Sequence, residues 1–107
     1  MKISWACALA LLVAQPGHAA TATHTTYGAG SETCGDWTQA RKASDWTTVN
    51  RMSSWVAGYL SATGRLVPMR DTDGGAINSY LDGFCQSHPL EAFEHATVTL
   101  VTELGGQ

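Results

Sequence analysis

Residues 46–65 read WTTVNRMSSWVAGYLSATGR and carry the clearest helical pattern in this 107-residue chain. Apolar side chains recur there every three or four positions, which is the spacing of one face of an α-helix. Asp45 directly precedes the stretch, and a carboxylate at that position caps a helix by accepting hydrogen bonds from its first N–H groups. The pattern predicts a helix over Trp46–Arg65, with an apolar face made of Val49, Met52, Val56, Tyr59, Leu60 and Thr63 and widened by Trp55.

Helices are also predicted on both sides of this stretch. The earlier one runs from about 33 to 43, with Ser31 or Thr33 as its cap. A loop at 66–75 follows the central helix, since it contains a proline and two adjacent glycines. The next helix then spans roughly 76–87, and its cap is one of Asp71, Thr72 and Asp73.

A fourth helix is predicted to begin at Pro89, because proline suits the first helical position, with Ser87 or His88 as its cap. Two glycines after Leu104 end this helix. The β-branched run at 97–99 is also compatible with a strand, but the caps and the apolar spacing favour a helix. No alternating strand pattern occurs elsewhere, so the predicted class is all-α, a single small four-helix domain.

The first 19 residues are typical of a cleaved export signal. A lysine at position 2 precedes an uncharged apolar run over 3–14, which is too short for a membrane span of about 20 residues. Small residues at 17 and 19 fit cleavage after Ala19, and a membrane anchor or a buried helix is the alternative. We expect a periplasmic protein without a membrane span, with a signal peptide at 1–19, a flexible lead-in at 20–31 and the helical domain at 32–105.

Removal of the signal takes Cys7 away and leaves Cys34 and Cys85 as a pair. Two cysteines in an exported chain of this size usually pair, because the compartment is oxidising. A bond between them closes a loop of about 50 residues and stabilises the fold by about 4 kcal/mol. A redox role is the alternative, but it is favoured by cationic neighbours, whereas Cys34 lies between Glu32 and Asp36. We expect a structural disulfide.

The charge balance excludes two classes of partner. Nine acidic residues face five Lys and Arg once Lys2 is removed, which leaves a net charge of −4. Nucleic acids and anionic membranes are bound by basic surfaces. We therefore expect no binding of either.

No motif for catalysis, metal binding or nucleotide binding stands out. His88 and His95 are seven residues apart with Cys85 nearby, but the predicted helix boundary prevents a shared face, and a disulfide sulfur is no metal ligand. Asp71 and Asp73 lie at a helix start, where capping explains them. We expect no enzyme activity, no metal and no cofactor.

Aromatic residues are numerous for so short a chain. Three are expected in the core: Trp37, Phe84 and Phe93. Trp46 begins a helix and Trp55 lies at the edge of an apolar stripe, so both are candidates for a partly exposed interface. The side chains expected to bind a protein partner are Trp46, Trp55, Tyr59 and Met69.

Three segments together resemble a known family. They are GSETCGDW at 30–37, WVAGYL at 55–60, and YLDGFC at 80–85 followed by Pro89-Leu90. This pattern resembles the HdeA/HdeB-like group of small exported bacterial proteins, and also the Tai-type helical immunity proteins that neutralise type VI secretion amidases. The resemblance implies a four-helix fold with Cys34 joined to Cys85 and a binding role without catalysis. For the HdeA type it also implies acid-activated holding of unfolded clients and a homodimeric resting state.

Two functions follow as hypotheses. One is an acid-stress holding chaperone: below about pH 3 the carboxylates are neutral and the mature chain carries roughly +9, so self-repulsion loosens the fold and exposes apolar faces. The other is a partner-specific module, such as an immunity protein that blocks a toxin or a secretion-system accessory protein. This second function predicts a preformed groove at neutral pH that includes Trp46, Trp55 or the loop at 66–75.

Overall fold

The computed structural model describes residues 23–105, so the predicted signal peptide at 1–19 and the glycine at 106 lie outside the described residues. Between 23 and 105 the chain forms four α-helices, one short 3-10 helix and no strand beyond an isolated bridge. In chain order the helices are η1 (Gly28–Ser31), α1 (Cys34–Lys42), α2 (Trp46–Thr63), α3 (Gly74–Ser87) and α4 (Phe93–Leu104). The predicted all-α class with four helices is confirmed.

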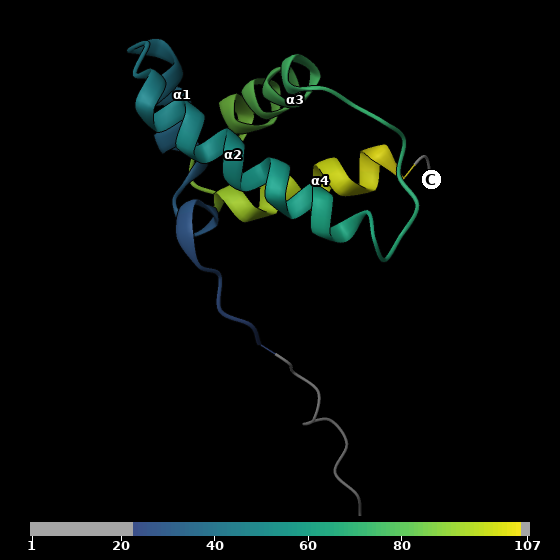
Figure 1. Ribbon diagram of the computed structural model, residues 1–107. Helices are drawn as coiled ribbons and strands as arrows, with labels where there is room; N and C mark the ends of the chain where they lie inside the picture. Colours follow the sequence, from purple (N-terminus) through teal and green to yellow (C-terminus); the bar gives the residue numbers. More distant parts are fainter. Residues whose placement is uncertain (1–22, 106–107) are drawn as a thin grey trace, which may run out of the picture.

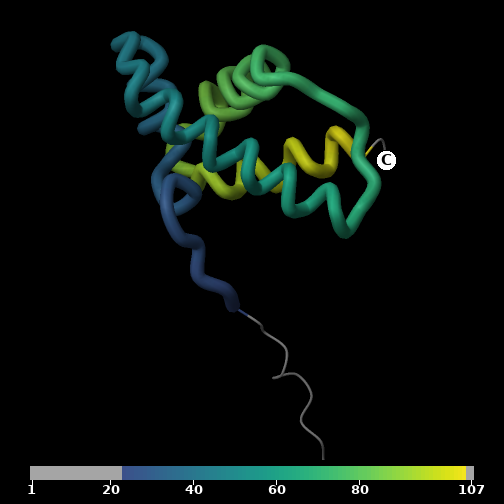
Figure 2. The backbone as a smooth tube through the Cα atoms, viewed as in Figure 1, coloured from purple at the N-terminus to yellow at the C-terminus, as the bar shows by residue number. Residues whose placement is uncertain are grey.

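The four α-helices form one bundle. Figure 1 shows α2 in front of α4, α3 above them, and α1 at the end of the bundle where α2 begins. α1 contacts both α2 and α3, and α3 contacts α4. Figure 2 traces residues 64–73 as a long loop that leaves the end of α2, passes the C-terminal end of α4 and reaches the start of α3.

Side-chain caps begin three helices at predicted residues. Thr33 and Asp36 form a capping box at α1, in which each side chain accepts a hydrogen bond from the backbone N–H of the other residue. Asp45 caps α2 and Asp73 caps α3, each by accepting from the N–H three residues ahead. These caps satisfy N–H groups that the first turn of a helix leaves without partners. Local sequence therefore determines where these helices start.

The core forms where the four helices meet. Trp37 and Phe93 are fully buried, and their rings stack with centroids 5.5 Å apart. Cys34 and Cys85 are joined in a fully buried disulfide between α1 and α3, which confirms the predicted pairing. Phe84, also expected in the core, is half-buried and packs against it. The other buried apolar residues of the helices are Ala40, Val49, Met52, Val56, Leu60, Ile77, Leu81, Ala96, Leu100 and Leu104.

The start of α4 differs from the prediction. The helix begins at Phe93 after Ala92, which makes no side-chain cap, and not at Pro89. Ser87 is instead the last residue of α3, and His88 is the C-cap of that helix. The prediction that one of these two residues caps the fourth helix is therefore wrong.

The cause is a set of hydrogen bonds between residues 89–93 and the start of α1. The Pro89 carbonyl accepts from Gly35 N, and the Glu91 carbonyl accepts from Cys34 N, each at 2.8 Å. These N–H groups belong to the first turn of α1, which cannot pair them internally. Residues 89–92 therefore provide carbonyl acceptors for the first turn of α1 and are not part of α4.

The chain before α1 also differs from the predicted flexible lead-in at 20–31. Gly28–Ser31 form η1, which contacts α2 and α4, and both Ala29 and Gly30 are buried. We name residues 24–32 the N-terminal strap. The prediction of an unstructured lead-in is wrong for η1, because these small residues pack closely on the ring of Trp55.

Candidate functional site

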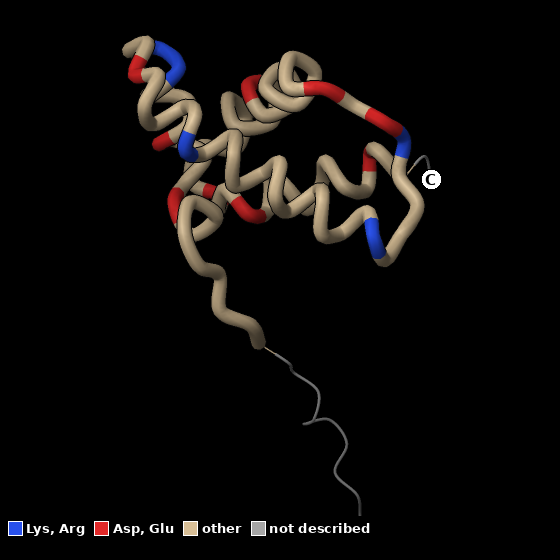
Figure 3. The backbone as a smooth tube through the Cα atoms, in the orientation of Figure 1, with Lys and Arg blue, Asp and Glu red and all other residues tan. Residues whose placement is uncertain are grey.

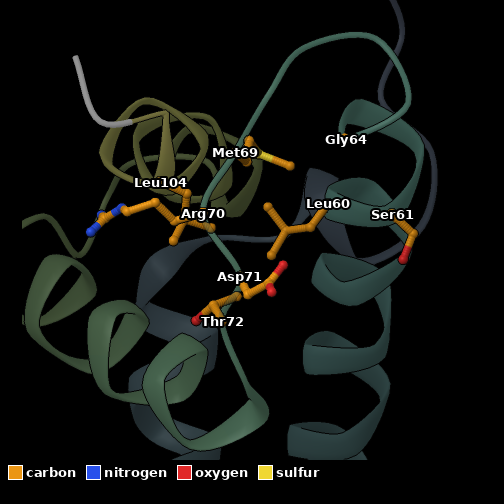
Figure 4. A pocket seen from close by; sticks show the side chains of 8 residues that line it. All are labelled: Leu60, Ser61, Gly64, Met69, Arg70, Asp71, Thr72 and Leu104. Carbon is orange, nitrogen blue, oxygen red and sulfur yellow. The ribbon is translucent and has the colours of Figure 1, made fainter.

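A groove of about 310 Å³ lies at the end of the bundle where α2 finishes. We name it the open-end groove. Figure 4 shows its lining, which comes from α2, α4 and the loop between α2 and α3. The lining residues are Leu60, Ser61, Gly64, Met69, Arg70, Asp71, Thr72 and Leu104.

Arg70 of the loop is hydrogen-bonded to the C-terminal end of α4. Its backbone N–H donates to the carbonyl of Leu104 at 2.8 Å, and its guanidinium Nη2 donates to the carbonyl of Glu103 at 2.7 Å. The same guanidinium lies 3.8 Å from the Glu103 carboxylate. A cation at the C-terminus of a helix is favourable, because the last carbonyls carry the negative end of the dipole. The loop is thereby fixed across the end of α4.

The groove has an apolar floor and an exposed apolar neighbour. Leu60 and Leu104 are buried at its base, and Met69 is half-buried between them and the solvent. The same loop also exposes Leu66 (84%) and Val67 (42%), which lie between the lining residues Gly64 and Met69 in the sequence. Methionine adapts its shape to different apolar ligands. The combination of a preformed hollow and exposed aliphatic side chains suits an apolar anchor of another protein.

Charges of both signs surround the groove. Along the loop that follows α2 the cations come first and the acids follow, as Figure 3 shows. These residues are Arg65, Arg70, Asp71 and Asp73. Such a rim gives a partner polar contacts around an apolar centre, which is the usual anatomy of a protein interface.

The four residues predicted to bind a partner do not form one site. Met69 lines the open-end groove, whereas Trp46 is 55% exposed at the first residue of α2. Eighteen residues of α2 separate the start of the helix from its end, which is about 27 Å of helix. Trp55 and Tyr59 lie between, half-buried, with ring centroids 5.3 Å apart.

Trp55 is engaged by the N-terminal strap. Its indole Nε1 donates to the carbonyl of Tyr27 at 2.9 Å. A Cβ added to Gly30 would lie 2.2 Å from Cζ2 of the same ring, so only glycine fits there. The small residues of the strap are the only feature of the sequence that points to a close contact there. They do not indicate that the contact is with Trp55.

A second hollow, of about 420 Å³, lies between α1 and α2 and includes three acids and Arg51. Its charged groups already have structural partners. Glu32 pairs with Arg51, and the hydrogen bonds that the guanidinium donates to this carboxylate raise the pKa of Arg51. Asp36 and Asp45 are helix caps, and the bonds from the Thr48 side chain and backbone lower the pKa of Asp45. The charged residues of this hollow are therefore explained by ion pairing and helix capping within the fold.

The two histidines considered as ligands have other contacts. His88 Nδ1 lies 2.8 Å from the carbonyl of Phe84, and its ring stacks on that residue with centroids 4.2 Å apart. His95 hydrogen-bonds Glu91 one turn earlier on the chain. Within residues 23–105, no three His, Cys, Asp or Glu side chains are grouped so that they could hold a metal ion.

Comparisons of the chain with protein-family models, with curated proteins and with solved structures find no match. In the part of the chain that the structure describes, none of the helices combines the length and the apolar character that a membrane crossing requires.

Proposed function

We propose that the protein is a non-catalytic periplasmic binding protein that engages a specific protein partner through the open-end groove. The observation that supports this most strongly is the groove itself, which is lined by half-buried Met69 and buried Leu60 and Leu104, with Leu66 almost fully exposed in the same loop. A few apolar contacts in a well-packed pocket commonly carry most of the binding free energy of an interface. The groove is formed by two helix ends and by a loop that Arg70 bonds to α4, and a site that is already formed loses less conformational freedom on binding.

This geometry corresponds to the partner-specific class, which includes immunity proteins and secretion-system accessory proteins. A preformed groove at neutral pH at the loop over 66–75 was the expectation for that class, and Arg70 holds the loop in place through α4. The partner is expected to present an apolar side chain flanked by charges of both signs, because Arg70 and Asp71 line the groove.

The test is capture of a stoichiometric partner from the native periplasm at neutral pH. Met69→Asp places a charge in the groove and should abolish capture. Val98→Asp is the matched control, because Val98 is a 41% exposed apolar residue of α4 that does not line the groove. Recovery of no stoichiometric partner, or equal capture by the Met69→Asp and wild-type chains, contradicts the proposal.

A second function, acid-triggered holding of unfolded clients, is favoured by a different observation. Carboxylates hold the N-terminal strap at both ends, through Glu94 with Thr26 and His24, and through Glu32 with Arg51. These ties weaken when the carboxylates are protonated. Suppression of client aggregation at pH 2–3, measured by light scattering, tests this function, and undiminished aggregation contradicts it.

A further inference from the structure

A hollow of about 180 Å³ lies between α1 and α3 and shares no residue with the open-end groove. We name it the α1–α3 hollow. Figure 1 shows these two helices next to each other at the end of the bundle where α2 begins. The lining residues are Thr38, Arg41, Lys42, Asp82 and Gln86. All five side chains are polar or charged, whereas the open-end groove has an apolar floor.

The acid that lines this hollow, Asp82, already accepts hydrogen bonds from within the fold. Its Oδ1 accepts from Trp37 Nε1 and from Arg41 Nε, both at 2.9 Å, and its Oδ2 accepts from Arg41 Nη2 at 2.7 Å. This pair leaves Nη1 of the guanidinium without a bond to Asp82. Asp82 therefore holds Arg41 in place beside the hollow and leaves one of its nitrogens for another acceptor.

The hollow has more hydrogen-bond donors than acceptors. The hydroxyl oxygen of Thr38 is buried and makes no hydrogen bond, which destabilises a fold. The ammonium of Lys42 makes no ion pair within residues 23–105. A ligand that brings acceptor oxygens would satisfy both groups together with Arg41 Nη1. The chemistry of the lining therefore favours an anion.

The helix dipole explains only part of this arrangement. Arg41 and Lys42 lie in the last turn of α1, where cations are favourable because the final carbonyls carry the negative end of the dipole. The dipole accounts for their charge. It does not account for the hollow beside them, or for the buried hydroxyl of Thr38 one turn earlier. These two features indicate a binding site.

We propose that the α1–α3 hollow binds the carboxylate of an acidic side chain that a protein partner presents. Arg41 Nη1 and Lys42 donate to the carboxylate oxygens from the rim, and Thr38 donates from the buried side. This site goes beyond the proposed function, because neither α1 nor α3 lines the open-end groove. Its failure would leave that function untouched.

Charge and size select this ligand. Two cations and one carboxylate give the hollow a single net positive charge, which matches a carboxylate better than a doubly charged phosphate. The volume of about 180 Å³ is below the roughly 300 Å³ at which small-molecule pockets usually begin. The hollow therefore has room for one side chain and not for a large ligand.

The experiment is an NMR titration of the mature, oxidised chain at neutral pH with N-acetyl-glutamate α-amide, which presents one carboxylate on a short stem. Saturable shifts are expected at the backbone amides of Thr38 and Lys42 and at the side-chain amide of Gln86, with a dissociation constant in the millimolar range. N-acetyl-glutamine α-amide, the neutral isostere, should cause none. Equal shifts with both probes, or no saturable shift with the glutamate probe, overturn the proposal.

Two further probes test the class and the source of the ligand. Inorganic phosphate should bind more weakly than the glutamate probe, because its second charge lies close to Asp82. Tighter binding of phosphate contradicts a carboxylate site. Succinate presents carboxylates without a peptide backbone and should bind no more tightly than the glutamate probe. Tighter binding of succinate would assign the hollow to free acids and contradict a protein partner.

Lys42→Gln removes one charge from the site. It should weaken binding of the glutamate probe about fivefold, as expected for an exposed ion pair. Arg65→Gln is the matched control, because it removes the same charge from an exposed residue that does not line the hollow. Equal weakening in both variants would show that only the net charge of the chain matters, and this result also overturns the site.

Thr38→Val separates binding from stability, since valine has the shape of threonine without its hydroxyl. Binding of the glutamate probe should weaken about tenfold. The free energy of unfolding should not fall, because the hydroxyl that is lost has no partner in the fold. Thr63→Val, on half-buried Thr63 outside the hollow, should leave binding unchanged. A less stable Thr38→Val chain, or one that binds like the wild type, contradicts the proposal.

Discussion

At one end of the bundle Cys34 and Cys85 join α1 to α3 inside the core, and at the other end a ten-residue loop over 64–73 joins α2 to α3. The first end also has the stacked pair of Trp37 and Phe93 and the backbone bonds between 89–93 and α1. At the second end the loop is bonded to α4 by a single residue, Arg70. We refer to these as the closed end and the open end.

Under the proposed function, this difference divides the molecule into an end that stabilises the fold and an end that binds a partner. Buried apolar contacts and a covalent crosslink concentrate the free energy of folding at the closed end. The open end has buried Leu60 and Leu104 at the groove, but its loop also exposes Leu66 and Val67. Binding surfaces are commonly found in the less stable parts of a domain. The following variants test this division.

The largest effect should come from removing the disulfide. The double variant Cys34→Ala and Cys85→Ala opens a crosslink with a sequence separation of 51 residues. The loop-entropy model predicts a loss of about 4 kcal/mol in the free energy of unfolding, which is a large share of the stability of so small a domain. Urea denaturation followed by circular dichroism measures it. A loss well under 1 kcal/mol would show that the closed end does not depend on its crosslink.

Trp37→Phe tests the closed end without touching the disulfide. The indole Nε1 of Trp37 donates to Asp82 at 2.9 Å, and Asp82 also accepts from Arg41. The variant loses this hydrogen bond and leaves a small cavity beside Phe93, so we expect a loss of about 2 kcal/mol. Thermal unfolding gives the value. Unchanged stability would mean that the neighbouring rings refill the site.

The sequence predicts local features of this fold well and long-range ones less well. A cap depends on residues within one turn, so the sequence assigned Asp45 directly and placed Thr33 and Asp73 among a few candidates. The start of α4 could not be assigned in this way, because the bonds that hold Pro89 and Glu91 come from the distant first turn of α1. Local capping rules therefore placed the helix four residues too early.

The candidate site shows the same limit. Met69 could be singled out in the sequence, Leu60 lies on the predicted apolar face of the central helix, and Leu104 is the predicted end of the fourth helix. Their convergence in one groove depends on how the loop crosses α4, which no spacing in the sequence records. The N-terminal strap packs on Trp55 through Gly30. A glycine is needed at that position only because of the ring of Trp55, which lies 25 residues further along the chain.

Asp73→Ala sharpens the comparison at the open end. Asp73 is the cap that starts α3 where the loop arrives, and its side chain accepts from Ala76 N at 2.9 Å. Loss of such a cap costs about 1 kcal/mol. Amide exchange should increase in the first turn of α3, and not near Cys85. Asp73→Asn is the control, since asparagine caps equally well; an equal loss in both variants would show that the cap is not the cause.

The smallest effect on stability, and the most selective effect on binding, should come from Val67→Ser. Val67 is 42% exposed in the loop, two residues before Met69 of the open-end groove, and Val98 on α4 is 41% exposed and belongs to another element, so Val98→Ser is a control of equal chemistry. Both variants should change the free energy of unfolding by less than about 0.5 kcal/mol, because neither side chain is buried. Only Val67→Ser should weaken partner binding, by about tenfold if Val67 contributes to the interface centre. Titration calorimetry with the captured partner measures this, and equal affinities of the two variants would place the interface elsewhere on the molecule.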